Sequence, residues 1–178
     1  ETAQDIIAEA DRLEAWVRNL LSYARPLSGV HEAVALPPLV DGVIDHFARE
    51  MEKRDISGRS TLAHDLPLAK GDAFLLGQVL HSLVANAVEA IEQGGTIEIA
   101  GKSVPAQQRV ELTIRDSGPG MSAEQLNRAF TPFYTTKPKG LGVGLALAKR
   151  IVERFGGRIF IDSAPGRGTT VCLSMPLA

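Results

Sequence analysis

The chain carries four short stretches in a set order: SLVANAVEA at residues 82–90, DSGPG at 116–120, FTPFYTTK at 130–137 and GLGVGL at 140–145. The first lies in an apolar helical pattern, the second ends a strand-like alternation, and the last precedes another helical pattern. Residues 117–141 contain Gly and Pro repeatedly and have little periodicity. We therefore expect helix, strand, long loop and helix, with polar groups gathered where these elements meet.

Hydrophobic periodicity on both sides of this region predicts one sheet with helices against it. Alternating apolar and polar residues indicate strands, and apolar residues three and four apart indicate helices. The expected strands are residues 56–66, 96–100, 109–114, 158–162 and 169–175. The expected helices begin after Pro37-Pro38, at Asp72 as N-cap and at residue 143, and the second ends near Glu92. The sum is an α/β (α+β) two-layer sandwich, a mixed β-sheet covered on one face by three helices.

The first part of the chain is expected to form a separate long helix. Its apolar residues alternate four and three apart, as in a heptad seam: Ile6, Ala10, Leu13, Val17, Leu20 and Ala24. Such an apolar stripe must be buried, either against the globular part of this chain or against another helix. We favour the second, with this helix as one strand of a dimeric helical bundle. Arg25-Pro26 stops the helix. The expected units are the bundle helix at 1–25, a linker at 26–37 and a globular domain at 38–178, with a lid at about 117–141.

Composition argues against several classes of protein. A net charge of -2 gives no basic footprint, so we expect no nucleic acid as partner. The single cysteine, Cys172, permits no intrachain disulfide and fits a reducing, cytoplasmic location. No uninterrupted apolar run approaches the roughly 20 residues of a membrane span. The chain opens without Met inside an apparent helix, so we interpret it as a fragment that would meet a membrane only through regions outside it.

Asn86 is a polar residue inside an otherwise apolar helical pattern. Its neutral amide oxygen can bind Mg²⁺, a hard cation that takes oxygen ligands and phosphate oxygens. Taken alone, Asn86 would be interpreted as an exposed or internally hydrogen-bonded asparagine. The later motifs favour its interpretation as a metal ligand. Ser82 and Glu89 fall on the same helix face, and Glu89 is a candidate to assist the metal through water.

Asp116 ends a strand and leads into Ser-Gly-Pro-Gly. A carboxylate held there can accept a hydrogen bond from the exocyclic amine of adenine, a group that guanine lacks at that position. Gly118 and Gly120 would let the backbone approach the base and would permit a positive φ. On its own, the pattern also fits a plain turn between two elements.

The stretch from Phe130 to Lys137 places aromatic residues in a polar loop. Phe130 and Phe133 can anchor the loop to the core or serve as the latch of a lid that closes over a nucleotide, and the two roles are compatible. Lys137 can reach phosphate as a point charge, with Lys139 as the alternative. Either ammonium group can also simply be solvated.

The glycine-rich run before the last helix contains Gly140, Gly142, Gly144 and Leu145. Unpaired backbone N–H groups and the helix dipole favour phosphate at such a helix end. The run follows no strand and lacks Gly-Lys-Ser/Thr, so it is neither a dinucleotide-binding fingerprint nor a P-loop. Thr169 and Thr170, at the start of the last strand, either border the base pocket or belong to a plain hairpin.

As a set, the four stretches resemble the N, first glycine, F and second glycine boxes of sensor histidine kinases. These enzymes belong to the GHKL group of gyrases, heat-shock chaperones, histidine kinases and mismatch-repair ATPases. The resemblance implies ATP and Mg²⁺ as ligands, Asn86 as metal ligand and catalytic residue, and Asp116 as the main base-reading residue. Residues 1–25 are similar to the second helix of the dimerisation and histidine-phosphotransfer region, down to LSYARP at 21–26. The family therefore implies transfer of the γ-phosphate of ATP to a His within a homodimer, then relay to an Asp of a response-regulator receiver domain.

Two departures from the family's pattern limit what the resemblance implies. Ser82 stands where gyrase-like members carry a glutamate that activates water, and serine is a poor general base, so ATP hydrolysis is not the expected main activity. No histidine of this chain has the family's acceptor setting of His-Glu or His-Asp with Asn-Pro soon after: His31, His46, His64 and His81. We therefore expect no phosphoacceptor His here and a nucleophile on an absent helix.

Three other functions stay open at this point. The chain can be a non-hydrolysing nucleotide-binding scaffold module, which would bind ATP and never transfer phosphate. It can be another GHKL-type enzyme, such as a protein-serine kinase. It can also be a purely helical interaction protein, which would have no affinity for nucleotides and which the four boxes disfavour.

Overall fold

The computed structural model describes residues 30–138 and 140–178, together with six isolated positions in the first part of the chain: Ile7, Ala10, Leu13, Glu14, Val17 and Leu21. These six positions are helical, as predicted. Four of the apolar ones expose between 50% and 60% of their surface: Ile7, Leu13, Val17 and Leu21. The rest of the predicted bundle helix, and the linker before residue 30, lie outside the described residues.

A five-stranded mixed sheet forms one layer of the globular part, in the order β2-β4-β5-β7-β6. β2 runs parallel to β4, and the other neighbours are antiparallel. The strands are β2 (Ile56–Thr61), β4 (Gly95–Val104), β5 (Arg109–Asp116), β6 (Arg158–Ser163) and β7 (Thr169–Pro176). All five predicted strands are present, although β4 extends beyond residue 100 and β2 ends well before residue 66.

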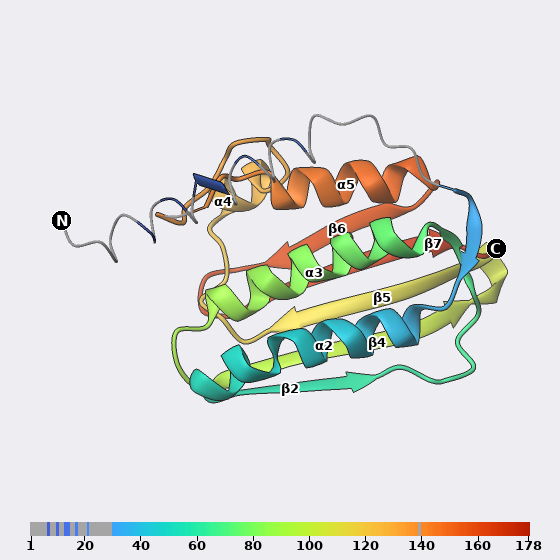
Figure 1. The fold of residues 1–178 in the computed structure, drawn as a ribbon, viewed down its shortest axis with the longest axis horizontal. Coiled ribbons are helices and arrows are strands. Elements are labelled where there is room, and N and C mark those ends of the chain that lie inside the picture. The colour runs from blue at the N-terminus through green and yellow to red at the C-terminus, as the bar shows by residue number, and fades with distance from the viewer. Residues whose placement is uncertain are drawn as a thin grey trace.

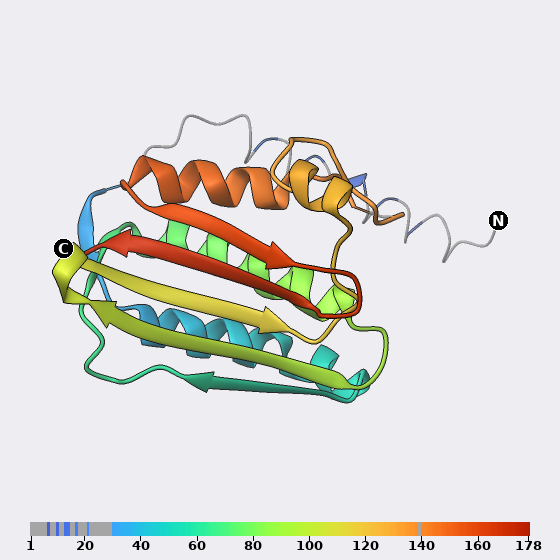
Figure 2. The same cartoon turned by 180° about the vertical axis from the view of Figure 1, so that it is seen from behind.

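Three helices cover one face of this sheet: α2 (Leu36–Lys53), α3 (Ala73–Ala90) and α5 (Gly144–Arg154). Figure 1 shows them in front of the strands, and Figure 2, from behind, shows the strands in front of the helices. Strand alternation turns Ile97, Ile99 and Ile114 into the core, where each is 1–2% exposed. The predicted two-layer sandwich with three helices on one face is confirmed.

α3 is the central helix and contacts both α2 and α5. Its N-cap is Asp72, as predicted, and the carboxylate accepts a hydrogen bond from Leu75 N at 3.0 Å. Among the described residues, α3 is the helix whose length and apolarity alone would suffice to cross a membrane. Here its stripe of Val79 and Leu83 is 1–2% exposed in the core, so its apolarity is explained by packing.

The segment predicted as linker contains ordered structure. β1 (Glu32–Val34) pairs antiparallel with β3 (Ala69–Gly71), and α2 begins at Leu36 with Pro37 in its first turn. Proline is tolerated there because the first N–H groups of a helix have no intrahelical partner. The predicted linker at 26–37 therefore includes β1 and the first residues of α2, and neither short strand was predicted.

The long loop predicted over 117–141 contains a short helix, α4 (Ala123–Arg128). Its N-terminus is a capping box in which Ser122 accepts from Gln125 N while the Gln125 side chain accepts from Ser122 N. The Ser-x-x-Gln spacing is a sequence signal for a helix start, and it would have identified α4.

Replacing Asp72 with alanine is expected to lower the free energy of unfolding by about 1 kcal/mol, because α3 loses its N-cap. The same carboxylate also accepts from Val30 N at 3.2 Å, so the loss includes the tether of the segment before β1. Urea unfolding measures the effect. Asp72→Asn keeps a side-chain acceptor and is the control; an equal loss in both variants would assign the effect to charge rather than capping.

Candidate functional site

A cavity of about 1110 Å³ opens between α3, the ends of β5 and β7, the loop after β5 and the start of α5. This volume is at the large end of ligand pockets. Nine of the predicted site residues line it: Asn86, Asp116, Gly120, Lys137, Gly140, Gly142, Gly144, Leu145 and Thr169. Residues that lie far apart in the sequence therefore meet around one space.

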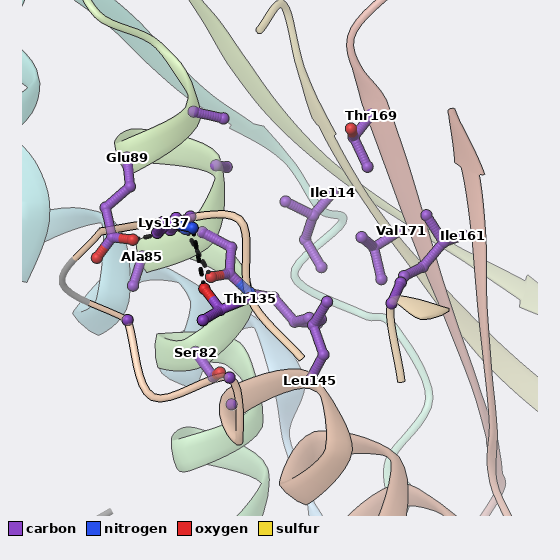
Figure 3. A pocket seen from close by; sticks show the side chains of 18 of the residues that line it. Ser82, Ala85, Glu89, Ile114, Thr135, Lys137, Leu145, Ile161, Thr169 and Val171 are labelled. Atoms are coloured by element: carbon purple, nitrogen blue, oxygen red, sulfur yellow. Dashed lines mark hydrogen bonds and ion pairs between the residues drawn. The ribbon is translucent and has the colours of Figure 1, made fainter. Parts of the chain in front are cut away.

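One end of the cavity is apolar around a buried carboxylate. Ile114, Ile161 and Val171 come from three neighbouring strands, and Figure 3 shows them beside Thr169. Asp116 lies opposite Thr169 in the β5–β7 ladder and is 6% exposed. The three apolar residues were not predicted as part of the site. Ile114 and Val171 lie two residues from Asp116 and Thr169, so strand alternation places them on the same face and could have identified them.

Asp116 is held by the turn that follows it. Its Oδ1 accepts a hydrogen bond from Gly118 N at 2.9 Å, and a side chain at Gly118 would meet that oxygen at 2.8 Å. Burial raises the pKa of Asp116, while hydrogen bonds from the backbone of Gly118 and Thr169 and the charge of Lys137 oppose the shift. The result is an oriented acceptor in a largely dehydrated place.

The other end of the cavity is charged. Lys137 Nζ donates to Asn86 Oδ1 at 3.0 Å and to Glu89 Oε2 at 2.5 Å, as the dashed lines of Figure 3 mark. The backbone of the same lysine donates to Thr135 Oγ1 at 3.0 Å. Asn86 is thus neither part of the apolar core nor fully exposed, and its amide oxygen faces the ammonium group of Lys137. Lys139, the alternative to Lys137, lies outside the described residues.

The glycine-rich run brings backbone, rather than side chains, to the cavity. Gly142 has φ +72°, and a Cβ there would lie 2.5 Å from Tyr134 O. A Cβ at Gly144 would lie 2.7 Å from Ser82 Oγ, so α5 begins in contact with α3. Val143 caps α5 without a side-chain hydrogen bond, and no acidic residue occupies the first turn. The N–H groups of that turn are therefore available to an anion.

Four predicted residues do not line the cavity. Gly118 acts through Asp116, and Thr170 lies on the opposite face of β7 from Thr169 by strand alternation. Phe130 packs against the core, with Lys149 Nζ 5.3 Å from its ring centre. Phe133 is 55% exposed, has φ +65° and donates its N–H to Gly142 O at 2.8 Å. Of the two aromatic residues, Phe130 is thus the anchor of the loop.

His81 lies at the edge of the cavity, on α3. Its ring centre lies 4.9 Å from the ring centres of both His46 and Phe47. Burial is the main cause that lowers the pKa of His81, and the charge of the nearby His46 lowers it further. These contacts give His81 a packing role between α2 and α3. Within the described part of the chain, no group of three or more His, Cys, Asp or Glu side chains is placed to hold a metal.

Replacing Asp116 with asparagine is expected to stabilise the fold at neutral pH. The raised pKa means that the folded chain binds this proton more tightly than the unfolded chain, so the contribution to stability falls as the pH rises through the folded pKa. Asparagine removes the buried charge and retains an acceptor for Gly118 N. The gain should therefore be present above the folded pKa and disappear toward the ordinary aspartate value of about 3.9.

Urea unfolding across this pH range measures the effect, and Asp162→Asn, at an exposed position of β6, is the matched control. If Asp116→Asn were less stable than the native chain at neutral pH, the buried charge would be net stabilising and the argument wrong.

The family described as histidine kinase-, DNA gyrase B- and HSP90-like ATPase matches residues 71–178. The sensor histidine kinase ZraS of Escherichia coli (strain K12) is 37% identical over 177 residues, which are 99% of this chain and 38% of ZraS. Sporulation kinase A of Bacillus subtilis (strain 168) is 34% identical over 172 residues, 96% of this chain and 28% of that kinase. The chain thus spans well under half the length of these relatives.

Solved structures show the same fold. The catalytic domain of histidine kinase ThkA has a TM-score of 0.75 and 29% identity, covering 83% of this chain and 96% of that one. Full-length ShkA in complex with AMPPNP has a TM-score of 0.86 at 24% identity, covering 96% of this chain and 37% of ShkA. The chain therefore belongs to the family of histidine kinase-, DNA gyrase B- and HSP90-like ATPases, and carries the ATP-binding catalytic domain found in sensor histidine kinases.

Proposed function

We propose that this chain is the ATP-binding catalytic module of a protein-histidine kinase of two-component signal transduction. One observation carries the proposal: a single cavity joins a buried carboxylate at one end to an amide oxygen that faces a cation at the other, and an uncapped helix start also lines it. These are the groups that an adenine base, a metal and a row of phosphates require.

Adenine is the base that the apolar end favours. The carboxylate of Asp116 accepts the exocyclic amine, while Ile114 and Val171 contact the ring. Guanine carries a carbonyl at the corresponding position, and its oxygen would face the carboxylate without a proton between them. An unpaired polar contact of this kind in a buried place costs about 1–3 kcal/mol, which is sufficient for selectivity.

The phosphates lie toward the start of α5 and Lys137. The backbone N–H groups after Gly142 supply hydrogen bonds and the positive end of the helix dipole. Lys137 supplies a point charge from the lid, and closure of the lid excludes water from the reacting phosphate. Ser82 contacts the helix start and offers no effective base for water, which favours transfer over hydrolysis.

The residues fit Mg²⁺. The amide oxygen of Asn86 already accepts a cationic donor, and neutral oxygens of this kind are ligands that Mg²⁺ takes together with phosphates and water. When bound, the metal neutralises charge that develops on the phosphates. Asn86 would hold it, and its catalytic role is to position the metal against the nucleotide.

The acceptor is a His of a helix that this chain does not contain. All four histidines are described, and two of them, His46 and His81, pack against each other with ring centres 4.9 Å apart. The exposed apolar positions of the N-terminal helix support a dimeric bundle that would bring the acceptor in. ThkA has been solved in complex with the response regulator protein TrrA, and that structure, with 26% identity and a TM-score of 0.80, supports a response-regulator receiver domain as the final partner.

Asn86→Ala is expected to reduce phosphate transfer by about 100-fold or more, because the metal loses its protein ligand. The measurement uses ATP labelled at the γ-phosphate, Mg²⁺, and an acceptor protein that carries both bundle helices and a disabled ATP domain. Acid-labile, base-stable label on the acceptor is the result expected for the native chain. Asn127→Ala, an exposed asparagine of α4, is the matched control; unchanged labelling with Asn86→Ala would remove Asn86 from the mechanism.

The same assay separates the other functions. Acid-stable label would identify a protein-serine kinase of the same fold. Tight ATP binding without transfer to the cognate acceptor would identify a nucleotide-binding scaffold module, and either result would overturn the proposal.

A further inference from the structure

The two side chains that face Lys137 converge on one point. Asn86 and Glu89 are three residues apart on α3, so they share a helix face, and their oxygens lie 3.0 Å and 2.5 Å from the same ammonium nitrogen. Figure 3 shows Lys137, on the loop, beside Glu89 of α3, with a dashed line between the two side chains. We call this pair of oxygens, Asn86 Oδ1 and Glu89 Oε2, the cation cradle.

A carboxylate in this place opposes a polyanion. Glu89 lines the same cavity as the start of α5, where the phosphates of a nucleotide would lie. A triphosphate and a carboxylate repel unless a cation lies between them. Glu89 is therefore unfavourable for bare ATP and favourable for ATP that brings a divalent cation.

The lysine can leave the cradle at small cost. The side chains of Lys137 and Glu89 are 36% and 52% exposed, and exposed ion pairs of this kind contribute only about 0–1 kcal/mol. Lys137 also lies on the lid, and its own backbone N–H makes a local bond, to Thr135 Oγ1 at 3.0 Å. The contact is thus easily exchanged.

We propose that the cation cradle is occupied in turn by two cations, the ammonium of Lys137 before nucleotide binds and the magnesium of Mg·ATP afterwards. The incoming metal releases Lys137, which is then available to the phosphates. Glu89 contributes negative charge to the metal's position and so makes nucleotide binding depend on metal. This inference rests on the proposed function, since it requires ATP to bind in this cavity.

The test is the metal dependence of ATP affinity, measured without any transfer reaction. Titration calorimetry gives the dissociation constant of ATP with Mg²⁺ and with EDTA, and the ratio of the two is the metal enhancement. Glu89→Gln is expected to tighten the binding of metal-free ATP and to reduce the metal enhancement by about fivefold. Glu92 lines the same cavity and, in the described part of the chain, makes no hydrogen bond or ion pair with Lys137, so Glu92→Gln should keep the native enhancement.

Three results would contradict either the cation cradle or the proposed function. A native metal enhancement in Glu89→Gln, with Asn86→Ala losing it, would overturn the cradle and leave Glu89 as a partner of the lysine only. Equal reductions in Glu89→Gln and Glu92→Gln would also overturn it, because the effect would then be the general charge of the cavity. Absence of ATP binding to the native chain, with or without Mg²⁺, would contradict the proposed function itself. Thermal unfolding of each variant confirms that the exposed substitutions leave the fold intact.

Discussion

The packing of α3 is the constraint on which the rest of the structure depends. One face of this helix buries Val79 and Leu83 between the sheet and the neighbouring helices. The adjoining face presents Asn86 and Glu89 to the cavity. The helical period thus ties these two side chains to the core, and a shift of α3 that kept them in place would expose its apolar stripe. The same helix receives the start of α5 at Ser82, where only a glycine leaves room.

Rigid and exchangeable parts meet at the cavity. The end that holds Asp116 belongs to the central strands, with the carboxylate bonded to its own turn and paired across the ladder with Thr169. The end that holds Lys137 belongs to a long loop anchored through Phe130 and a short capped helix. Recognition of a base requires a fixed acceptor, whereas entry and release of phosphates require a part that moves. The two requirements are met by different elements.

Much of this arrangement could be predicted from the sequence, because each motif lies at an element boundary where local chemistry is strong. Asp116 at a strand end and Asp72 as an N-cap are local features, and the structure places both as predicted. β1 and β3 were missed because strands of three residues are too short to have a periodicity. The pairing of Lys137 with Glu89 could not be predicted either, since it joins residues 48 positions apart through the path of a loop.

The charges of the side chains in the cavity link the roles proposed for them. Three carboxylates line it: Asp116, buried on β5, Glu89, half-exposed on α3, and Glu92, just after α3. All three are unfavourable for a bare polyanion. In the proposed complex the buried carboxylate of Asp116 would face the base and serve selectivity. In the same complex Glu89 would lie at the phosphate end, where only a cation would make it compatible with the ligand. A lysine before binding and a metal afterwards both satisfy that requirement, so the site can stay electrostatically balanced in its empty and loaded forms without any change in the core.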